Sequence, residues 1–124
     1  MFEVSSEINF ASAHHLREYC GSCENLHGHN WLVKAVVRTE KLNKIGLAID
    51  FKTLKKHLKA IIDKLDHTDL NTIFTEINPS SENIAKYIFE ELKNSLKNEC
   101  ADVWVHRIDV WETPGNCASY LVAP

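Results

Sequence analysis

The sequence predicts an α+β domain with the element order β-β-α-α-β-β, in which two helices cover one face of an antiparallel sheet. Apolar residues repeat at every second position in both terminal thirds of the chain, and they line one helical face in the middle third. Turn-forming residues separate these segments. Strands at both ends with helices together in the middle favour an antiparallel sheet with the helices on one side.

Composition and length set the limits of the fold and of the function. The chain has 124 residues and no internal repeat, low-complexity tract or linker, so residues 1–124 are expected to form a single domain. Hydrophobic residues make up 44% and charged residues 25%, which excludes wholesale disorder. The longest apolar run spans only residues 45–49, which is too short to cross a membrane.

The net charge and the number of cysteines indicate which binding partners and which cellular compartment to expect. A net charge of −3 argues against a nucleic-acid protein that works by neutralising phosphates. The first residues lack the basic and apolar regions of a secretory signal. Four cysteines in such a chain indicate cytoplasmic thiols rather than a disulfide framework.

The first two strands are predicted from alternation. Residues 2–12 form the first strand, because apolar residues occupy most even positions there. Residues 14–29 break the alternation and are rich in His, Cys, Gly and Asn, so they are predicted to form a loop. Alternation resumes over residues 31–37, which predicts a second strand, and a turn is expected over residues 41–46.

Two helices follow in the middle of the chain. Residues 51–65 place their apolar side chains on one helical face and most of their lysines on the other, with Asp50 as the expected N-cap. The second helix follows Pro79 and runs to Leu96, with Ser80 or Ser81 as its cap.

The last third returns to strand character. Residues 103–110 form the third strand, and a change of phase near residues 106–107 predicts a β-bulge. A turn at residues 114–116 leads to a final strand at residues 118–122. Both helices would lie on one face of the sheet, so the other face would still need cover, which suggests association between copies.

Three histidines form a candidate metal site. His27 and His29 are two positions apart, so in an extended segment their imidazoles point to the same side. His14 lies near the end of the first strand, and the loop can bring it alongside. Three imidazoles with one open position form the ligand set of a catalytic zinc site. The alternative is that some of them are surface or capping residues.

A different metal site uses the cysteines. Cys20 and Cys23 with His27 and His29 could form a structural zinc site, but only three residues separate the Cys pair from the His pair. The two cysteines could also form a redox pair, although no strand precedes them and no helix follows.

Two further acidic residues are candidates for catalysis or ligand binding. Asp66 can orient His67 for acid–base work, although a histidine near a helix C-terminus also stabilises the helix dipole. Glu112 lies between apolar residues at the end of a strand, where it is either exposed at an edge or able to accept two parallel N–H groups of a ligand.

Five motifs together carry a resemblance. They occur at residues 10–14 (FASAH), 23–30 (CENLHGHN), 65–71 (LDHTDLN), 78–83 (NPSSEN) and 111–113 (WET). This ordered set resembles the 6-pyruvoyltetrahydropterin synthase / 6-carboxytetrahydropterin synthase family nearly from end to end. The resemblance implies the tunnelling fold, in which sheets from three subunits join into a barrel. It also implies that two trimers stack into a homohexamer with active sites between subunits.

The resemblance also assigns roles to residues. It implies that His14, His27 and His29 hold Zn²⁺ and that Cys23 is the catalytic base, assisted by Asp66 and His67. Glu112 is expected to anchor a pterin ring. In the fourth motif, Ser80 and Ser81 are expected to contact the substrate.

The spacing of the second motif is similar to that of one branch of the family. Cys23 lies four residues before His27, as in the enzymes of the queuosine pathway. The implied activity is zinc-dependent conversion of 7,8-dihydroneopterin triphosphate to 6-carboxy-5,6,7,8-tetrahydropterin, acetaldehyde and triphosphate. Where many members have Arg or Lys after the first zinc ligand, this chain has His15, so Arg17 or a lysine of a neighbouring subunit is expected to bind the triphosphate.

Other activities stay open. Glu24 directly after Cys23 is similar to a subgroup that also forms 6-hydroxymethyl-7,8-dihydropterin for folate. Formation of 6-pyruvoyltetrahydropterin is another possible outcome within the family. A small zinc-stabilised binding domain is the alternative that is not an enzyme.

Overall fold

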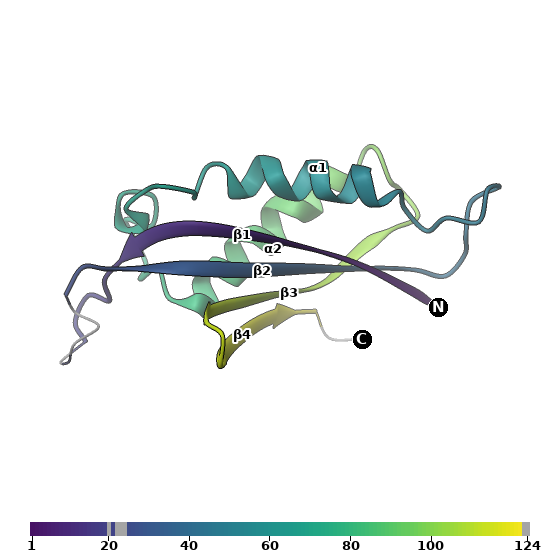
Figure 1. Ribbon diagram of the computed structural model, residues 1–124. Helices are drawn as coiled ribbons and strands as arrows, with labels where there is room; N and C mark the ends of the chain where they lie inside the picture. Colours follow the sequence, from purple (N-terminus) through teal and green to yellow (C-terminus); the bar gives the residue numbers. More distant parts are fainter. Residues whose placement is uncertain (20, 22–24, 123–124) are drawn as a thin grey trace.

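A computed structural model describes residues 1–19, 21 and 25–122 (Figure 1). The elements follow the order predicted from the sequence, with one short 3₁₀ helix, η2, added between the two α-helices. Their bounds are β1 Phe2–His14, β2 His27–Thr39, α1 Phe51–Ile62, η2 Leu70–Thr72, α2 Ser81–Leu96, β3 Trp104–Thr113 and β4 Asn116–Leu121. The fold is therefore α+β, as predicted.

The four strands form one antiparallel sheet in the order β1-β2-β3-β4. The long hairpin of β1 and β2 pairs Phe2 with Thr39 at one end and His14 with His27 at the other. Residues 14 and 27–29 therefore belong to strands, and the loop expected over residues 14–29 is shorter than predicted. The prediction relied on apolar side chains, whereas the inward-facing positions at this end of the hairpin carry histidines.

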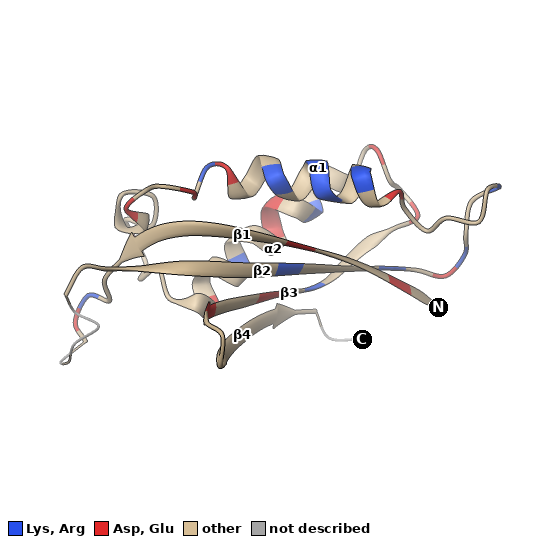
Figure 2. Cartoon of the chain, in the orientation of Figure 1, with Lys and Arg blue, Asp and Glu red and all other residues tan. Residues whose placement is uncertain are grey.

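Both helices cover the same face of the sheet, and the core lies between them and the strands (Figure 1). α1 packs mainly on β1, and α2 packs on β3 and β4. The buried stripe of α1 consists of Leu54, Leu58, Ile61 and Ile62, while its lysines lie on the exposed side (Figure 2). The helix ends at Ile62 rather than at residue 65.

Helix caps and a bulge appear where the sequence predicted them. The Asp50 side chain accepts a hydrogen bond from the backbone N–H of Lys52 at the start of α1. In β3, Arg107 faces Val36 while Val105 faces Val37, so His106 is the extra residue of a β-bulge.

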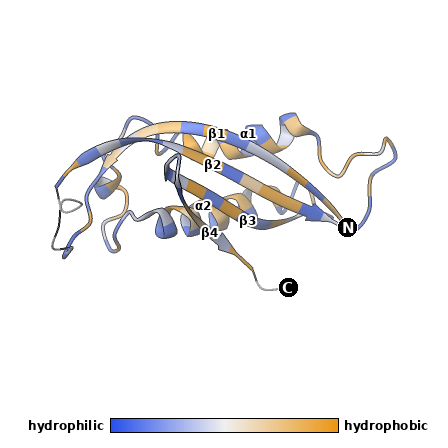
Figure 3. Cartoon of the chain, turned by 60° about the horizontal axis from the view of Figure 1, so that its bottom comes forward, coloured by the Kyte–Doolittle hydropathy of each residue, from blue (hydrophilic) through white to orange (hydrophobic). Residues whose placement is uncertain are grey.

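Hydrophilic and hydrophobic residues alternate along the strands (Figure 3), and charged side chains lie on the face of the sheet that the helices leave open. This face carries ion pairs between Arg38 and Glu3, with Nη2 and Oε2 2.6 Å apart, and between Arg107 and Asp109. A face of this kind can contact water, so it does not by itself require the cover expected from the sequence. In the part of the chain that the structure describes, no helix is long and apolar enough to span a membrane.

Candidate metal centre

Four side chains meet at the end of the sheet where β1 finishes and β2 begins. His14 lies directly opposite His27 in the hairpin, and His29 follows two positions later on the same face. Glu112 reaches the group from β3. The ligand atoms of these four residues all lie within 4.8 Å of one another. The group can therefore hold a metal ion.

Backbone carbonyls orient two of the imidazoles. The Nδ1 of His14 lies 2.7 Å from the carbonyl oxygen of Pro79, just before α2, and the Nδ1 of His27 lies 2.6 Å from that of Asn25. Because a carbonyl oxygen only accepts, each Nδ1 carries the hydrogen and each Nε2 keeps a free lone pair. This arrangement is how proteins commonly fix a histidine that binds a metal.

The surroundings of His29 favour its neutral form. Burial lowers the pKa of His29, and the nearby His14 and His27 act in the same direction, against the opposing effect of Glu112. Trp31, which is fully buried, sets its ring edge-on to both His14 and His29, with centroid distances of 4.9 and 5.4 Å. A neutral imidazole beside an apolar wall is a good ligand for a metal.

Glu112 lies beside the imidazoles. Its Oε1 is 2.7 Å from the Nε2 of His29 and 3.6 Å from the Nε2 of His14. Its other oxygen, Oε2, accepts a 3.5 Å hydrogen bond from the hydroxyl of Ser81 in the first turn of α2. The sequence named Glu112 as a pterin anchor but gave no sign that it would adjoin the histidines.

The residues present fit a divalent metal. The Nε2 atoms of His14 and His29 are buried and have no hydrogen-bond partner among the described residues, although Glu112 lies at ion-pair distance. An unpaired buried polar atom costs free energy unless another partner binds it. Three imidazole nitrogens with a carboxylate oxygen form a donor set suited to zinc.

The serines of the fourth motif have different contacts. Ser80 is the N-cap of α2, and its hydroxyl accepts a hydrogen bond from the backbone N–H of Asn83. Ser81 donates to Glu112 and so belongs to the edge of the metal centre. Both residues were expected to contact the substrate, and that role stays a prediction.

Asp66 and His67 form a pair outside the cluster of histidines. Their side chains are joined through Oδ1 and Nδ1 at 2.9 Å, and the His67 side chain is 81% exposed. The segment runs along the edge of β1, where Asp66 accepts from the backbone N–H of Ala11 and the N–H of His67 donates to the carbonyl of Ala11. The bond from Ala11, followed by the interaction with His67, lowers the pKa of Asp66.

His67 also has an unusual backbone. Its φ of 56° lies in the left-handed region, which non-glycine residues rarely adopt. The bond to Ala11 holds it there and turns its side chain outward. Within one chain, the pair therefore displays a carboxylate-supported imidazole to the surroundings rather than to the metal centre.

Two other predictions concern the loop between β1 and β2. Cys23, the expected base, and Cys20 lie outside the described residues. Arg17, an expected phosphate ligand, instead donates from its guanidinium to the carbonyl oxygens of Asn71, Phe74 and Ile77. These hydrogen bonds attach Arg17 to the segment that precedes α2. The guanidinium of Arg17 is therefore bound within its own chain.

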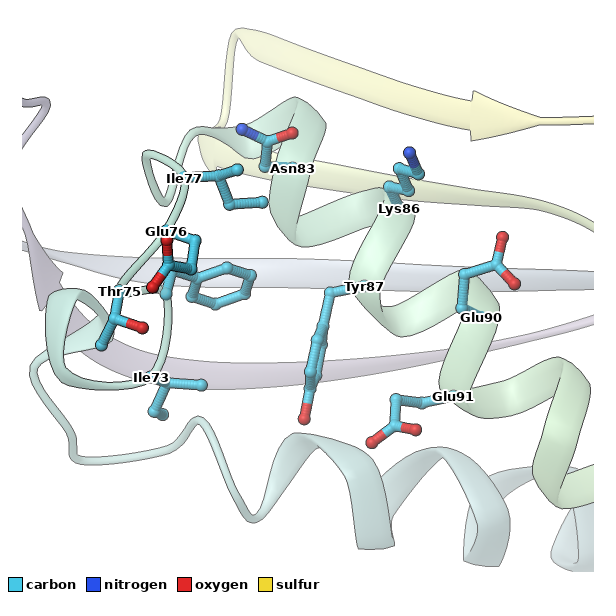
Figure 4. A pocket seen from close by; sticks show the side chains of 10 residues that line it. Ile73, Thr75, Glu76, Ile77, Asn83, Lys86, Tyr87, Glu90 and Glu91 are labelled. Carbon is cyan, nitrogen blue, oxygen red and sulfur yellow. The ribbon is translucent and has the colours of Figure 1, made fainter.

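A separate pocket of about 580 Å³ lies between α2 and the segment that follows η2 (Figure 4). Tyr87 and Phe74 pack edge-to-face in its wall, and Glu76, Glu90 and Glu91 lie around it. Of the predicted site residues that the structure describes, none lines this pocket.

Comparison with known proteins gives the family. A family model described as 6-pyruvoyl tetrahydropterin synthase matches residues 3–122. A protein of Synechocystis sp. named 6-carboxy-5,6,7,8-tetrahydropterin synthase is 33% identical over 126 residues, which cover 98% of this chain and 94% of the relative. A Pyrococcus furiosus protein named dihydroneopterin monophosphate aldolase is 39% identical over 89 residues, which cover 72% of each chain.

The fold agrees with these matches. The structure of Caenorhabditis elegans 6-pyruvoyl tetrahydropterin synthase superposes with a TM-score of 0.84 at 28% identity, covering 98% of this chain and 96% of the other. Sequence and structure therefore agree over nearly the whole length, and this chain belongs to the 6-pyruvoyl tetrahydropterin synthase family.

Proposed function

We propose that this protein is a zinc-dependent pterin synthase that converts 7,8-dihydroneopterin triphosphate to 6-carboxy-5,6,7,8-tetrahydropterin, acetaldehyde and triphosphate. The observation that carries the proposal is the convergence of three imidazoles whose free nitrogens face one point at the end of the sheet. Relatives named 6-carboxy-5,6,7,8-tetrahydropterin synthase support the choice of reaction.

Each residue has a role in this proposal. His14, His27 and His29 hold the zinc, which when bound polarises the hydroxyl groups of the substrate side chain. Cys23 removes a proton as a thiolate, because a free thiol with a pKa of about 8.5 ionises more readily beside positive charge.

Glu112 binds the pterin in this proposal. A carboxylate accepts two parallel N–H bonds, which matches the guanidine-like edge of a pterin ring. The hydroxyl of Ser81, in the first turn of α2, donates a hydrogen bond to this carboxylate and helps to hold it in place.

The position of Asp66 and His67 supports a site shared between subunits. The pair lies at the edge of β1 and outside the cluster of its own chain. We propose that the chain assembles as a hexamer of two stacked trimeric barrels, in which this pair passes protons at the site of an adjacent subunit.

A second candidate reaction has a specific observation in its favour. The Pyrococcus furiosus relative named dihydroneopterin monophosphate aldolase is 39% identical over its matched region. Aldol-type cleavage would give 6-hydroxymethyl-7,8-dihydropterin, the same product that Glu24 after Cys23 suggests.

Mass analysis of products separates these reactions. The purified protein is incubated with 7,8-dihydroneopterin triphosphate and, separately, with the monophosphate. We expect 6-carboxy-5,6,7,8-tetrahydropterin and acetaldehyde from the triphosphate. A 6-hydroxymethyl product from either substrate would favour the aldolase, and no product from either would contradict both enzymes.

Metal removal tests the alternative of a zinc-stabilised binding domain. We expect a chelator to abolish turnover while the circular dichroism spectrum stays that of the folded protein, because an extensive core of apolar side chains from the sheet and both helices holds the fold together. Unfolding on chelation would instead indicate a structural metal.

A further inference from the structure

The carboxylate of Glu112 lies beside the three imidazoles, with the four ligand atoms within 4.8 Å of one another. A tetrahedral zinc with bonds of about 2.0–2.2 Å separates neighbouring ligand atoms by roughly 3.3–3.6 Å. The Oε1 of Glu112 lies 2.7 Å from one imidazole Nε2 and 3.6 Å from another, so its distances lie on either side of that value. A small adjustment of side chains would complete the tetrahedron.

The rest of the carboxylate is held so that only one oxygen faces the histidines. Oε2 is engaged by the hydroxyl of Ser81, which leaves Oε1 directed at His14 and His29. Ser81 belongs to the first turn of α2, whose N-terminal dipole favours a negative charge at this place. An oxygen donor therefore lies beside the nitrogens of the three histidines.

Exposure shows which ligand can leave. The side chain of His14 is 2% exposed and that of His29 is 18% exposed, whereas that of Glu112 is 29% exposed. Glu112 is therefore the most exposed of these three side chains.

We infer that Glu112 is the fourth ligand of the metal in the substrate-free protein, and that it exchanges with an oxygen of the substrate side chain. This inference rests on the proposed function. The exchange changes no oxidation state, because the carboxylate leaves with its charge and the incoming hydroxyl donates a lone pair. Once released, the carboxylate is free to accept the N–H groups of the pterin.

Cobalt substitution tests this inference without measuring activity. Metal-free protein is titrated with Co²⁺, whose visible absorption reports coordination number, and then with imidazole as a neutral probe ligand. In the wild-type protein, we expect a four-coordinate spectrum and weak binding of imidazole, because Glu112 fills the position. In Glu112→Ala and Glu112→Gln, we expect imidazole to bind about tenfold or more tightly, and Co²⁺ to bind about tenfold more weakly.

Control variants distinguish a failure of the proposed metal site from a failure of the fourth-ligand role of Glu112. Glu90→Gln removes an exposed carboxylate from the same helix that carries Ser81, and it should match the wild-type protein. His27→Ala should lose Co²⁺ binding, and retention of full affinity there would contradict the proposed metal site itself. If His27→Ala loses the metal while Glu112→Ala and Glu112→Gln keep the wild-type spectrum and imidazole affinity, only the fourth-ligand role is wrong.

Discussion

The imidazole of His14 is fixed by the carbonyl oxygen of Pro79, a residue 65 positions away in the chain. That single contact selects the tautomer and aims the other nitrogen at the metal centre. A backbone acceptor of this kind has no side-chain signature, so residue types alone could not have revealed it. The three histidines themselves were predicted because the two-residue spacing of His27 and His29, and the place of His14 near the end of the first strand, are visible in the sequence.

The two cysteines of the β1–β2 connection give the sharpest test of roles at the residue scale. Cys23→Ala should lower turnover by about 10²–10⁴-fold, the usual loss when a general base is removed. Its zinc content should stay at the wild-type level, because all three imidazoles remain. Turnover and zinc content are measured on the same preparation.

Cys20→Ala is the matched control for that measurement. It removes a thiol three residues away and should keep both zinc and near wild-type turnover. If both variants lose zinc equally, the cysteines are metal ligands, and the assignment of Cys23 as the base is wrong.

At the scale of elements, the start of α2 connects helix stability to the metal centre. Ser80 caps the helix, Pro79 before it accepts from His14, and Ser81 after it donates to Glu112. The expectation that Ser80 or Ser81 caps the helix is resolved in favour of Ser80. The sequence could not show that one of these three consecutive residues caps the helix while the other two contact the metal centre. Those contacts depend on how the start of the helix packs against the sheet.

A cap substitution tests this connection. Ser80→Ala should lower the free energy of unfolding by about 1 kcal/mol, because the N–H of Asn83 loses its acceptor. Ser80→Asp should restore most of it, since aspartate is an equally good cap. Urea denaturation of both variants measures the effect, and equal stability of Ser80→Ala and the wild-type protein would contradict the capping role.

The alternation of apolar residues predicted the strands correctly where the alternating side chains are buried in the core. It failed where histidines of the candidate site take the place of apolar residues on the same face. The alternation that defined residues 2–12 and 31–37 comes from the core face, and the structure has strands there. The hairpin extends further because backbone pairing continues to His14 and His27, whose side chains serve the site instead of the core. The bulge was predictable because one extra residue, His106, shifts the phase of the apolar positions.

At the scale of the whole molecule, the proposed metal site and the proposed proton-transfer pair lie in different places on one chain. The histidine cluster lies at the end of the sheet, on the face that the helices share, while Asp66 and His67 lie outside it, along the outer edge of β1. Element order predicted the layers of one subunit, but the sequence pattern could not place this pair, because its position depends on how the segment after α1 joins the strand edge.

Mixing two impaired variants tests whether sites form between subunits. Cys23→Ala and His67→Ala should each have strongly lowered turnover, because each lacks one group of the proposed proton path. When the two are unfolded and refolded together, activity should return, because some sites then receive both intact groups from different chains. Sedimentation should show hexamers for each variant and for the mixture, and a mixed hexamer without activity would contradict the shared site.

The pairing of His14 with His27 also makes metal uptake a check on folding quality. A slip of one residue between β1 and β2 would turn His14 to the opposite face. A slip of two would keep the apolar face buried but move His14 about 7 Å along its partner strand. Only the native alignment brings the imidazoles together, so the metal stoichiometry of a refolded preparation would count the correctly aligned hairpins before any substrate is added.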